Sequence, residues 1–275
     1  MEDIRAYLLD LDGVVYRGER LLPGARELAE WLDATGRKVL YLSNNSIATP
    51  QEVEAKLARL GMPSPEGRVL TAGQAAARVL AARFPHGRVF VLGLPAVEQM
   101  MEQAGLRAVW SESEHDDGQI PDVLLVALDR NLTYDRLRRA LGAILGGAAF
   151  YAVNRDPRLP VEDGFLPGTG SITAALEYAS GQKATIIGKP EPGIVVEAMH
   201  LLGVSPAQTL MVGDGLDLDI VAGRAAGVTT ALVLTGLATG EEAGRSTGMR
   251  RPHVVYKDLT DLLEAAVAAA RAASS

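Results

Sequence analysis

Short apolar runs alternate with amphipathic stretches along the whole chain of 275 residues, and this alternation limits the possible folds more than any other feature. Buried parallel strands appear in a sequence as short apolar runs, and helices that cover a sheet carry apolar residues three or four positions apart. The run at 4–9 is followed by a helical pattern at 25–32 and by a second run at 38–42. The pattern predicts an α/β fold with parallel strands.

The alternation continues to the end of the chain. A helix with a capping box, Thr49 and Glu52, and with Pro50 in its first turn is predicted to end near Gly61. Further strand-like runs follow, with helical patterns between most of them, and the last segment, 258–273, is predicted to be an alanine-rich helix. These runs are 88–92, 122–127, 149–153, 184–187, 209–212, 229–234 and 253–256.

Polar residues that directly follow strands gather near the two ends of the chain. They are Asp10, Asp12 and Ser43 near the N-terminus, and Lys189 and Asp214 near the C-terminus. Functional groups of open α/β sheets lie beyond the carboxyl ends of the strands, so both chain ends are expected to build one catalytic sheet. We therefore predict core segments at 1–72 and 187–275, with an inserted α/β domain at 73–186.

Composition narrows the possible functions. The formal net charge is −7, and an acidic surface repels a phosphate backbone, so nucleic acid is not an expected partner. The chain has no cysteine, which excludes thiol nucleophiles, disulfides and thiolate metal sites. The first apolar run is too short for a signal peptide or a membrane span, so we expect a cytoplasmic protein without a membrane partner.

Asp10 and Asp12 leave the first strand two positions apart. If the chain stays extended there, the two carboxylates point to the same side, and their repulsion has to be relieved by a cation or a shared proton. The alternative is a turn in which one aspartate caps the backbone. The pair alone does not decide between catalysis and turn chemistry.

The other polar residues favour catalysis. Ser43 ends the second strand, where its hydroxyl and the following N–H groups can hold a phosphate oxygen; a plain turn residue is the alternative. Lys189 lies between Gly188 and Pro190, directly after a buried strand, and the alternative is a solvated loop lysine. Asp214 begins a segment of three aspartates that ends at Asp219, a pattern that suggests a hard-cation site such as one for Mg²⁺.

Four segments together resemble the motifs of the haloacid dehalogenase superfamily in order, spacing and strand context. They are Asp10-Leu11-Asp12-Gly13-Val14-Val15-Tyr16, Leu42-Ser43-Asn44-Asn45-Ser46, Gly188-Lys189-Pro190-Glu191-Pro192, and Gly213-Asp214 with Asp219-Ile220. The segments 154–157 and 166–171 resemble the large α/β cap of the subfamily that contains p-nitrophenylphosphatases, phosphoglycolate phosphatases and pyridoxal phosphate phosphatases. The resemblance implies a Rossmann-like, doubly wound parallel-sheet core with an inserted α/β cap.

The resemblance also implies a function, a Mg²⁺-dependent phosphomonoester hydrolase. On this reading Asp10 attacks phosphorus and forms an aspartyl phosphate, and Asp12 is the acid and then the base. The implied phosphate-binding residues are Ser43, Asn44 and Lys189. The implied magnesium ligands are Asp10, the backbone carbonyl of Asp12, and Asp214, with Asp219 in or near the layer behind them.

The cap is expected to select the leaving group of a small phosphorylated metabolite. The candidate contacts are Arg155, Arg158 and Leu159, and ordinary surface arginines are the alternative. Relatives often form homodimers through the cap, so this assembly is one that the resemblance suggests. Two other functions stay open at this point: a phosphotransferase on the same scaffold, and a non-catalytic protein that binds a phosphorylated ligand.

Overall fold

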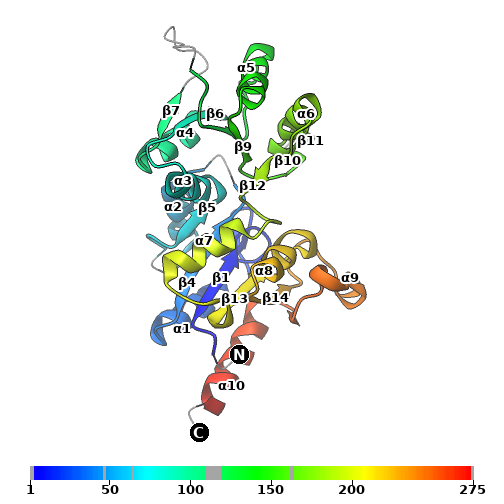
Figure 1. Ribbon diagram of the computed structural model, residues 1–275. Helices are drawn as coiled ribbons and strands as arrows, with labels where there is room; N and C mark the ends of the chain where they lie inside the picture. The colour runs from blue at the N-terminus through cyan, green and yellow to red at the C-terminus, as the bar shows by residue number, and fades with distance from the viewer. Residues whose placement is uncertain (1–2, 46–47, 64, 110–118, 162–163, 274–275) are drawn as a thin grey trace. The chain divides into compact units, whose positions relative to one another are not determined.

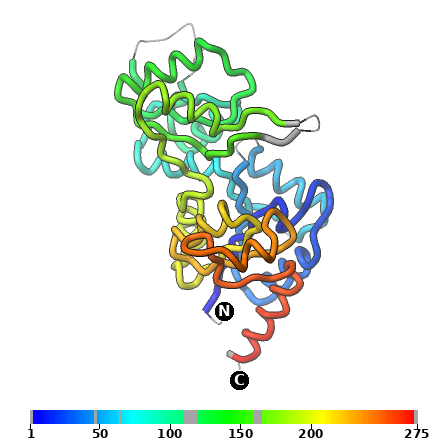
Figure 2. The backbone as a smooth tube through the Cα atoms, turned by 90° about the vertical axis from the view of Figure 1, so that its right-hand side faces the viewer, coloured from blue at the N-terminus to red at the C-terminus, as the bar shows by residue number. Residues whose placement is uncertain are grey.

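The computed structural model describes residues 3–45, 48–63, 65–109, 119–161 and 164–273. The chain forms two compact units. The core unit comprises residues 1–43, 50–70 and 189–275, and the inserted unit comprises residues 44–49 and 71–188. Both the blue N-terminal segment and the orange and red C-terminal segments belong to the core unit (Figure 2). The chain therefore begins and ends in the core unit, and it enters the inserted unit twice, at 44–49 and at 71–188.

A six-stranded sheet forms the centre of the core unit (Figure 1). Its strands are, in spatial order, β15 (Val254–Tyr256), β14 (Thr229–Val233), β13 (Thr209–Gly213), β1 (Ala6–Asp10), β4 (Lys38–Ser43) and β5 (Val69–Thr71). β1 is parallel to both β13 and β4, and β14 is parallel to β13 and β15. Every residue of β1 and β13 is buried, which explains their nearly continuous apolar sequences.

Helices cover this sheet and complete the core. α1 (Ala25–Ala34) contacts β4 and α10 (Leu259–Ala273), and α7 (Gly193–Leu202) contacts β1, β4 and α8 (Val221–Ala225). α1 buries its predicted apolar face. The remaining elements are α2 (Pro50–Leu60), α9 (Gly240–Arg245), the short hairpin β2 (Tyr16–Arg17) with β3 (Arg20–Leu21), a π-helical turn at Leu216–Ile220, and 3-10 turns at Pro206–Gln208 and Gly248–Arg250.

The strand order reverses at the centre of the core sheet. From β1 the chain moves through α1 to β4 on one side, and from β13 it moves through α8 to β14 on the other side. In open α/β sheets, ligands bind outside the carboxyl ends of the strands where the order reverses. Asp10 and Gly213 end the two strands that flank this point.

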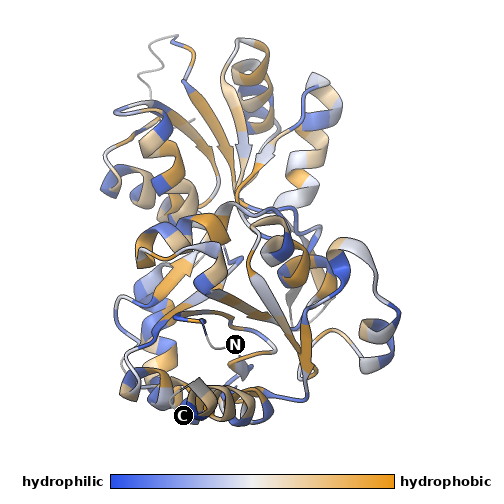
Figure 3. Cartoon of the chain, turned by 60° about the horizontal axis from the view of Figure 1, so that its bottom comes forward, coloured by the Kyte–Doolittle hydropathy of each residue, from blue (hydrophilic) through white to orange (hydrophobic). Residues whose placement is uncertain are grey.

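The inserted unit has its own parallel sheet. Its strands are, in spatial order, β12 (Thr185–Ile186), β9 (Ala149–Ala152), β8 (Val123–Val126), β6 (Arg88–Leu92) and β7 (Arg107–Val109). Its helices are α3 (Ala72–Arg83), α4 (Pro95–Gln103), α5 (Tyr134–Leu145) and α6 (Thr169–Ser180), and β10 (Arg158–Val161) forms an antiparallel hairpin with β11 (Gly164–Pro167). The strands of both sheets are drawn largely in the hydrophobic colours of Figure 3, as expected for sheets buried between helices.

The predicted α/β class with parallel strands is confirmed, and each predicted strand-like run contains a strand. The three-residue strands β5 and β7 and the two short hairpins have no counterpart among the predicted elements. The inserted unit extends over 71–188 and also takes in 44–49, against the predicted 73–186. Its role as a cap stays a prediction. Among the described residues, no helix has the length and apolar character needed to span a bilayer.

Candidate active site

The carboxyl ends of three neighbouring strands carry three of the residues singled out from the sequence. Asp10 is the last residue of β1, Ser43 is the last residue of β4, and Asp214 directly follows β13. Asp10 pairs in register with Leu42, so Ser43 stands one position beyond it on the adjacent strand. All three side chains are buried. Parallel pairing thus brings residues far apart in the chain to one edge of the core sheet.

Three carboxylates converge at this edge. One oxygen each of Asp10, Asp214 and Asp219 lies within 4.8 Å of the other two. Asp219 reaches this position because the π-helical turn folds back over the end of β13, where the N–H of Gly215 donates to Oδ2 of Asp219 at 3.0 Å. A Cβ at Gly213 would lie 2.0 Å from Cβ of Asp219, so the close return needs glycine at that position.

Lys189 lies within this carboxylate cluster. Its Nζ donates to Oδ1 of Asp10 and to Oδ1 of Asp219, the latter at 2.6 Å. The lysine side chain is only 3% exposed, so the alternative of a solvated loop lysine is wrong. The cluster thus contains one ammonium, of Lys189, and three carboxylates, so the buried site carries more negative than positive charge when all of these groups are ionised.

Burial and the neighbouring charges shift the pKa values of the cluster. Burial, with the negative charges of Asp219 and Asp214, raises the pKa of Asp10 to about 8 against the opposing effect of Lys189. Burial and the charge of Asp219 raise the pKa of Asp214 to about 6. Burial works to lower the pKa of Lys189, but the charges of Asp10 and Asp219 outweigh it and raise that pKa. A divalent cation would stabilise the charged carboxylates, and an all-oxygen donor set suits Mg²⁺.

A loop after β14 orients the Asp214 carboxylate, and its residues were not among the predicted site residues. The N–H of Leu237 donates to Oδ2 of Asp214 at 2.8 Å, and the N–H of Ala238 donates to the Asp214 carbonyl at 3.0 Å. A Cβ at Gly236 would lie 1.7 Å from the same Oδ2, so only glycine lets the loop approach this closely. The signal in the sequence was a lone glycine three residues after a strand.

The second aspartate of the first motif lies just outside the sheet. β1 ends at Asp10, and a turn with Gly13 at φ +83° carries the chain to Tyr16. Asp10 is buried, whereas Asp12 is exposed. The Tyr16 hydroxyl donates to Oδ2 of Asp12 at 3.4 Å, and the Thr235 hydroxyl donates to the Gly13 carbonyl at 2.6 Å. The two carboxylates thus have different environments: that of Asp10 is enclosed beside a lysine, and that of Asp12 is partly buried in a residue that is otherwise exposed, so that its pKa is raised mainly by burial.

Comparisons with known proteins identify the family of the chain. A family model described as haloacid dehalogenase-like hydrolase matches residues 7–107, and one described as HAD-hydrolase-like matches residues 186–262. An acid sugar phosphatase of Staphylococcus aureus is 35% identical over 263 residues, which cover 96% of this chain and 98% of the relative. The chain belongs to the haloacid dehalogenase-like hydrolases.

Solved structures of this family extend the match to the fold. A 4-nitrophenylphosphatase from Thermotoga maritima has 33% identity and a TM-score of 0.85, with 96% of this chain and 97% of that chain covered. A glycerol phosphate phosphatase from Mycobacterium tuberculosis, solved in complex with magnesium, has 34% identity and a TM-score of 0.83, with 94% of this chain and 76% of that chain covered. The predicted family, fold class and enzyme class, a haloacid dehalogenase-like phosphatase, are confirmed.

The first linker of this hydrolase belongs to the inserted unit. Asn44, which follows Ser43, accepts a hydrogen bond at its carbonyl from Nδ2 of Asn154 at 2.8 Å. Oδ1 of Asn154 in turn accepts the N–H of Asp156 at 3.2 Å. Asn154 therefore ties the linker to the segment of the inserted unit that was predicted to meet the substrate.

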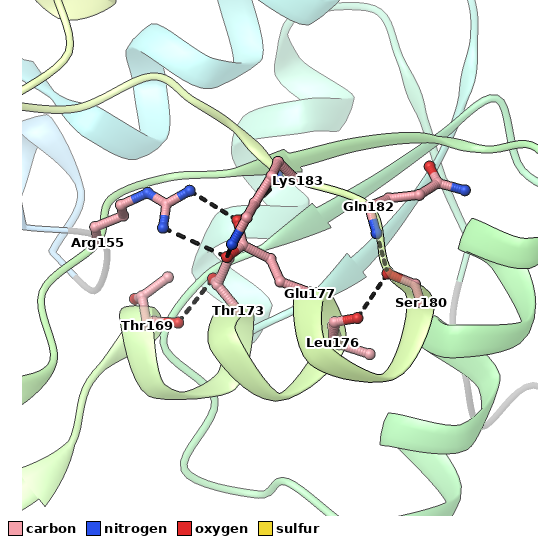
Figure 4. Close-up of polar contacts among 9 residues, drawn as sticks. Arg155, Thr169, Thr173, Leu176, Glu177, Ser180, Gln182 and Lys183 are labelled. Atoms are coloured by element: carbon pink, nitrogen blue, oxygen red, sulfur yellow. Dashed lines mark hydrogen bonds and ion pairs between the residues drawn. The ribbon is translucent and has the colours of Figure 1, made fainter.

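The predicted substrate-contacting residues of the inserted unit lie in and before the β10–β11 hairpin. The side chain of Glu177 is 5% exposed and forms two ion pairs (Figure 4). Its Oε1 lies 2.7 Å from Nη2 of Arg155, and its Oε2 lies 2.9 Å from Nζ of Lys183. The guanidinium of Arg158 lies 4.8 Å from the centroid of the Phe165 ring. Leu159 belongs to β10, and its side chain lies outside the described part of the structure. Arg155 thus forms an ion pair within the inserted unit, and its contact with substrate stays a prediction.

Proposed function

We propose that this chain hydrolyses small phosphomonoesters through an aspartyl phosphate on Asp10, with Mg²⁺ as cofactor. The observation that supports the proposal most is the cluster of Asp10, Asp214 and Asp219 around the buried ammonium of Lys189 at the point where the strand order reverses. A carboxylate that approaches a phosphate dianion needs its charge offset, and a lysine beside a divalent-cation site supplies this offset.

The residues that would hold Mg²⁺ are Asp10, Asp214 and the backbone carbonyl of Asp12, with Asp219 adjacent. When bound, Mg²⁺ would offset the charge that develops on the phosphoryl oxygens. Three buried carboxylate oxygens within 4.8 Å of one another, two of them on groups with raised pKa values, fit such a cation.

The reaction divides into two displacements. A carboxylate oxygen of Asp10 attacks phosphorus, the bond from phosphorus to the leaving oxygen breaks, and Asp12 gives its proton to that oxygen. Water then attacks the phosphorus of the aspartyl phosphate while Asp12 takes a proton from the water, and the bond to Asp10 breaks. The products are an alcohol and inorganic phosphate. Lys189, Ser43 and Asn44 are proposed to bind the phosphoryl oxygens.

The proposed substrates are sugar or polyol phosphates. Support comes from the names of the relatives, an acid sugar phosphatase and a glycerol phosphate phosphatase, which each align with more than nine tenths of this chain. Transfer of the phosphoryl group to an alcohol uses the same aspartyl phosphate, so it is the second function to test.

The test measures phosphate release from p-nitrophenyl phosphate and from glycerol phosphate, with and without EDTA. We expect EDTA to abolish turnover and Asp10→Asn to lower kcat by at least about 10²-fold. Asp217→Asn is the matched control, because Asp217 lies in the same acidic segment but pairs with Arg250 at 2.6 Å and is 73% exposed. Full activity in Asp10→Asn would sink the proposal, and a new phosphate ester in the presence of excess glycerol would reveal transfer.

The intermediate can be tested separately. Asp12→Asn removes the base of the second displacement, so a hydroxylamine-sensitive phosphoenzyme is expected to accumulate with p-nitrophenyl phosphate. The double variant Asp10→Asn with Asp12→Asn is the control and is expected to hold no covalent phosphate. Equal labelling of both proteins would place the phosphoryl group elsewhere.

A further inference from the structure

The hydroxyl of a buried tyrosine is aimed at the exposed aspartate of the first motif. Tyr16 is 5% exposed, and its hydroxyl donates to Oδ2 of Asp12 at 3.4 Å. No residue in the described part of the structure donates a hydrogen bond to the other carboxylate oxygen, Oδ1, so this oxygen can serve a substrate or a water molecule. An exposed aspartate without such a partner would sample several rotamers.

Backbone bonds hold the tyrosine and the aspartate in one turn. The N–H of Gly13 donates to the Tyr16 carbonyl at 2.9 Å, and the N–H of Tyr16 donates to the Leu11 carbonyl at 3.1 Å. Tyr16 also pairs with Leu21 in the hairpin of β2 and β3. The separation between the phenol ring and Asp12 is therefore set by a short, internally bonded segment.

A lysine from another element fixes the tyrosine ring. Nζ of Lys56, on α2, lies 3.8 Å from the centroid of the Tyr16 ring. The same Nζ lies 3.8 Å from Oε1 of Glu19, and the lysine side chain is only 25% exposed. A cation over an aromatic face is attracted by the ring, more strongly when it is partly withdrawn from water. Lys56 thus restrains the ring whose hydroxyl reaches Asp12.

We propose that Tyr16, restrained by Lys56, is a positioning residue that keeps the Asp12 carboxyl aligned with the leaving-group oxygen. The proposal rests on the proposed function, in which Asp12 protonates that oxygen. Proton transfer needs donor and acceptor within hydrogen-bond reach, and small losses of alignment lower rates strongly. Neither Tyr16 nor Lys56 needs to touch the substrate in this role.

This role has a signature that a purely structural role lacks. An alkoxide is a strongly basic leaving group and has to be protonated as it departs, whereas p-nitrophenolate departs without that help. The value of kcat/KM reports the steps up to the first bond cleavage. Loss of Asp12 alignment should therefore lower kcat/KM for glycerol phosphate and leave kcat/KM for p-nitrophenyl phosphate nearly unchanged.

The experiment compares Tyr16→Phe, Asp12→Asn and wild type on both substrates. Tyr41→Phe is the matched control, because Tyr41 is a buried tyrosine of the core unit whose hydroxyl has no hydrogen-bond partner among the described residues. We expect Tyr16→Phe to lower kcat/KM for glycerol phosphate about tenfold more than for p-nitrophenyl phosphate. Circular dichroism and melting temperature monitor folding of each variant.

The three variants separate the acid role of Asp12 from the positioning roles of Tyr16 and Lys56. If Asp12→Asn distinguishes the substrates but Tyr16→Phe does not, the positioning role is wrong and the acid role of Asp12 stands. If Asp12→Asn affects both substrates equally, the acid role fails, and the proposal for Tyr16 fails with it. Lys56→Met keeps the aliphatic stem and removes the charge, so we expect a change of the same direction as in Tyr16→Phe but smaller. Equal losses on both substrates in Lys56→Met would remove Lys56 from the proposal.

Discussion

Replacement of Gly236 by alanine should disable the proposed cation site without changing any carboxylate. The new Cβ would lie 1.7 Å from Oδ2 of Asp214 and 2.3 Å from its Cγ. To reach the 3.4 Å of an ordinary van der Waals contact, Oδ2 has to move by about 1.7 Å if the loop stays in place. Such a movement also breaks the 2.8 Å hydrogen bond from the Leu237 N–H.

The size of the effect follows from these distances. Mg²⁺ accepts its ligands only at about 2.0–2.1 Å, and misplacement of a site by about 1 Å costs on the order of 10²-fold in rate. We therefore expect Gly236→Ala to lower kcat by about 10²-fold at low Mg²⁺, with partial recovery as the Mg²⁺ concentration rises. The lost hydrogen bond to a buried carboxylate adds about 1–3 kcal/mol of destabilisation.

The assay follows p-nitrophenyl phosphate turnover across a MgCl₂ titration and, in parallel, the rise of the melting temperature when Mg²⁺ is added without substrate. Gly244→Ala is the matched control, because Gly244 lies in α9 and, apart from its own helical turn, no atom of the described residues lies within 4 Å of its Cβ position. The control should match wild type in both measurements. A wild-type Mg²⁺ titration and a wild-type melting shift in Gly236→Ala would refute the assignment of Asp214 to the cation site.

Two further predictions concern buried charges. Lys189→Met removes the ammonium that pairs with the carboxylates of Asp10 and Asp219. We expect kcat to fall at least about 10²-fold, and the free energy of unfolding, measured in EDTA at neutral pH, to fall by about 3–5 kcal/mol. Unchanged stability in a urea titration would contradict this. In the inserted unit, burial works to raise the pKa of Glu177, but hydrogen bonds from Lys183, the Ala184 N–H and Arg155 outweigh it, so the folded pKa lies below 4.5. The stability that its charge contributes is therefore present above about pH 4.5 and is lost as the pH falls through the folded pKa. Glu177→Gln should be less stable than wild type by about 1 kcal/mol at pH 7, and the difference should shrink below pH 4.5; a difference that does not change with pH would show that the charge contributes nothing.

Local sequence patterns predicted the long strands and helices well but did not predict the short strands. β1, β4, β13 and β14 are buried on both sides, so their apolar runs stand out from the polar stretches around them. β5 and β7 have three residues each, which is too few for any periodicity to be visible. The hairpin that carries Tyr16 was not predicted for the same reason, since strands of two residues show no hydrophobic periodicity.

The sequence by itself determined which side chains the candidate site contains, because aspartates and a lysine directly after buried strands are visible as short motifs. Only the tertiary structure decided how these groups act on one another. Lys189 is 179 positions from Asp10, and the pairing of β1 with β13 and β4 sets which charges become neighbours. Burial then shifts the pKa of Asp10 to about 8, which no local sequence encodes. The loop at Gly236 and the contact of Lys56 with Tyr16 are likewise non-local, so they became visible only when the chain was folded.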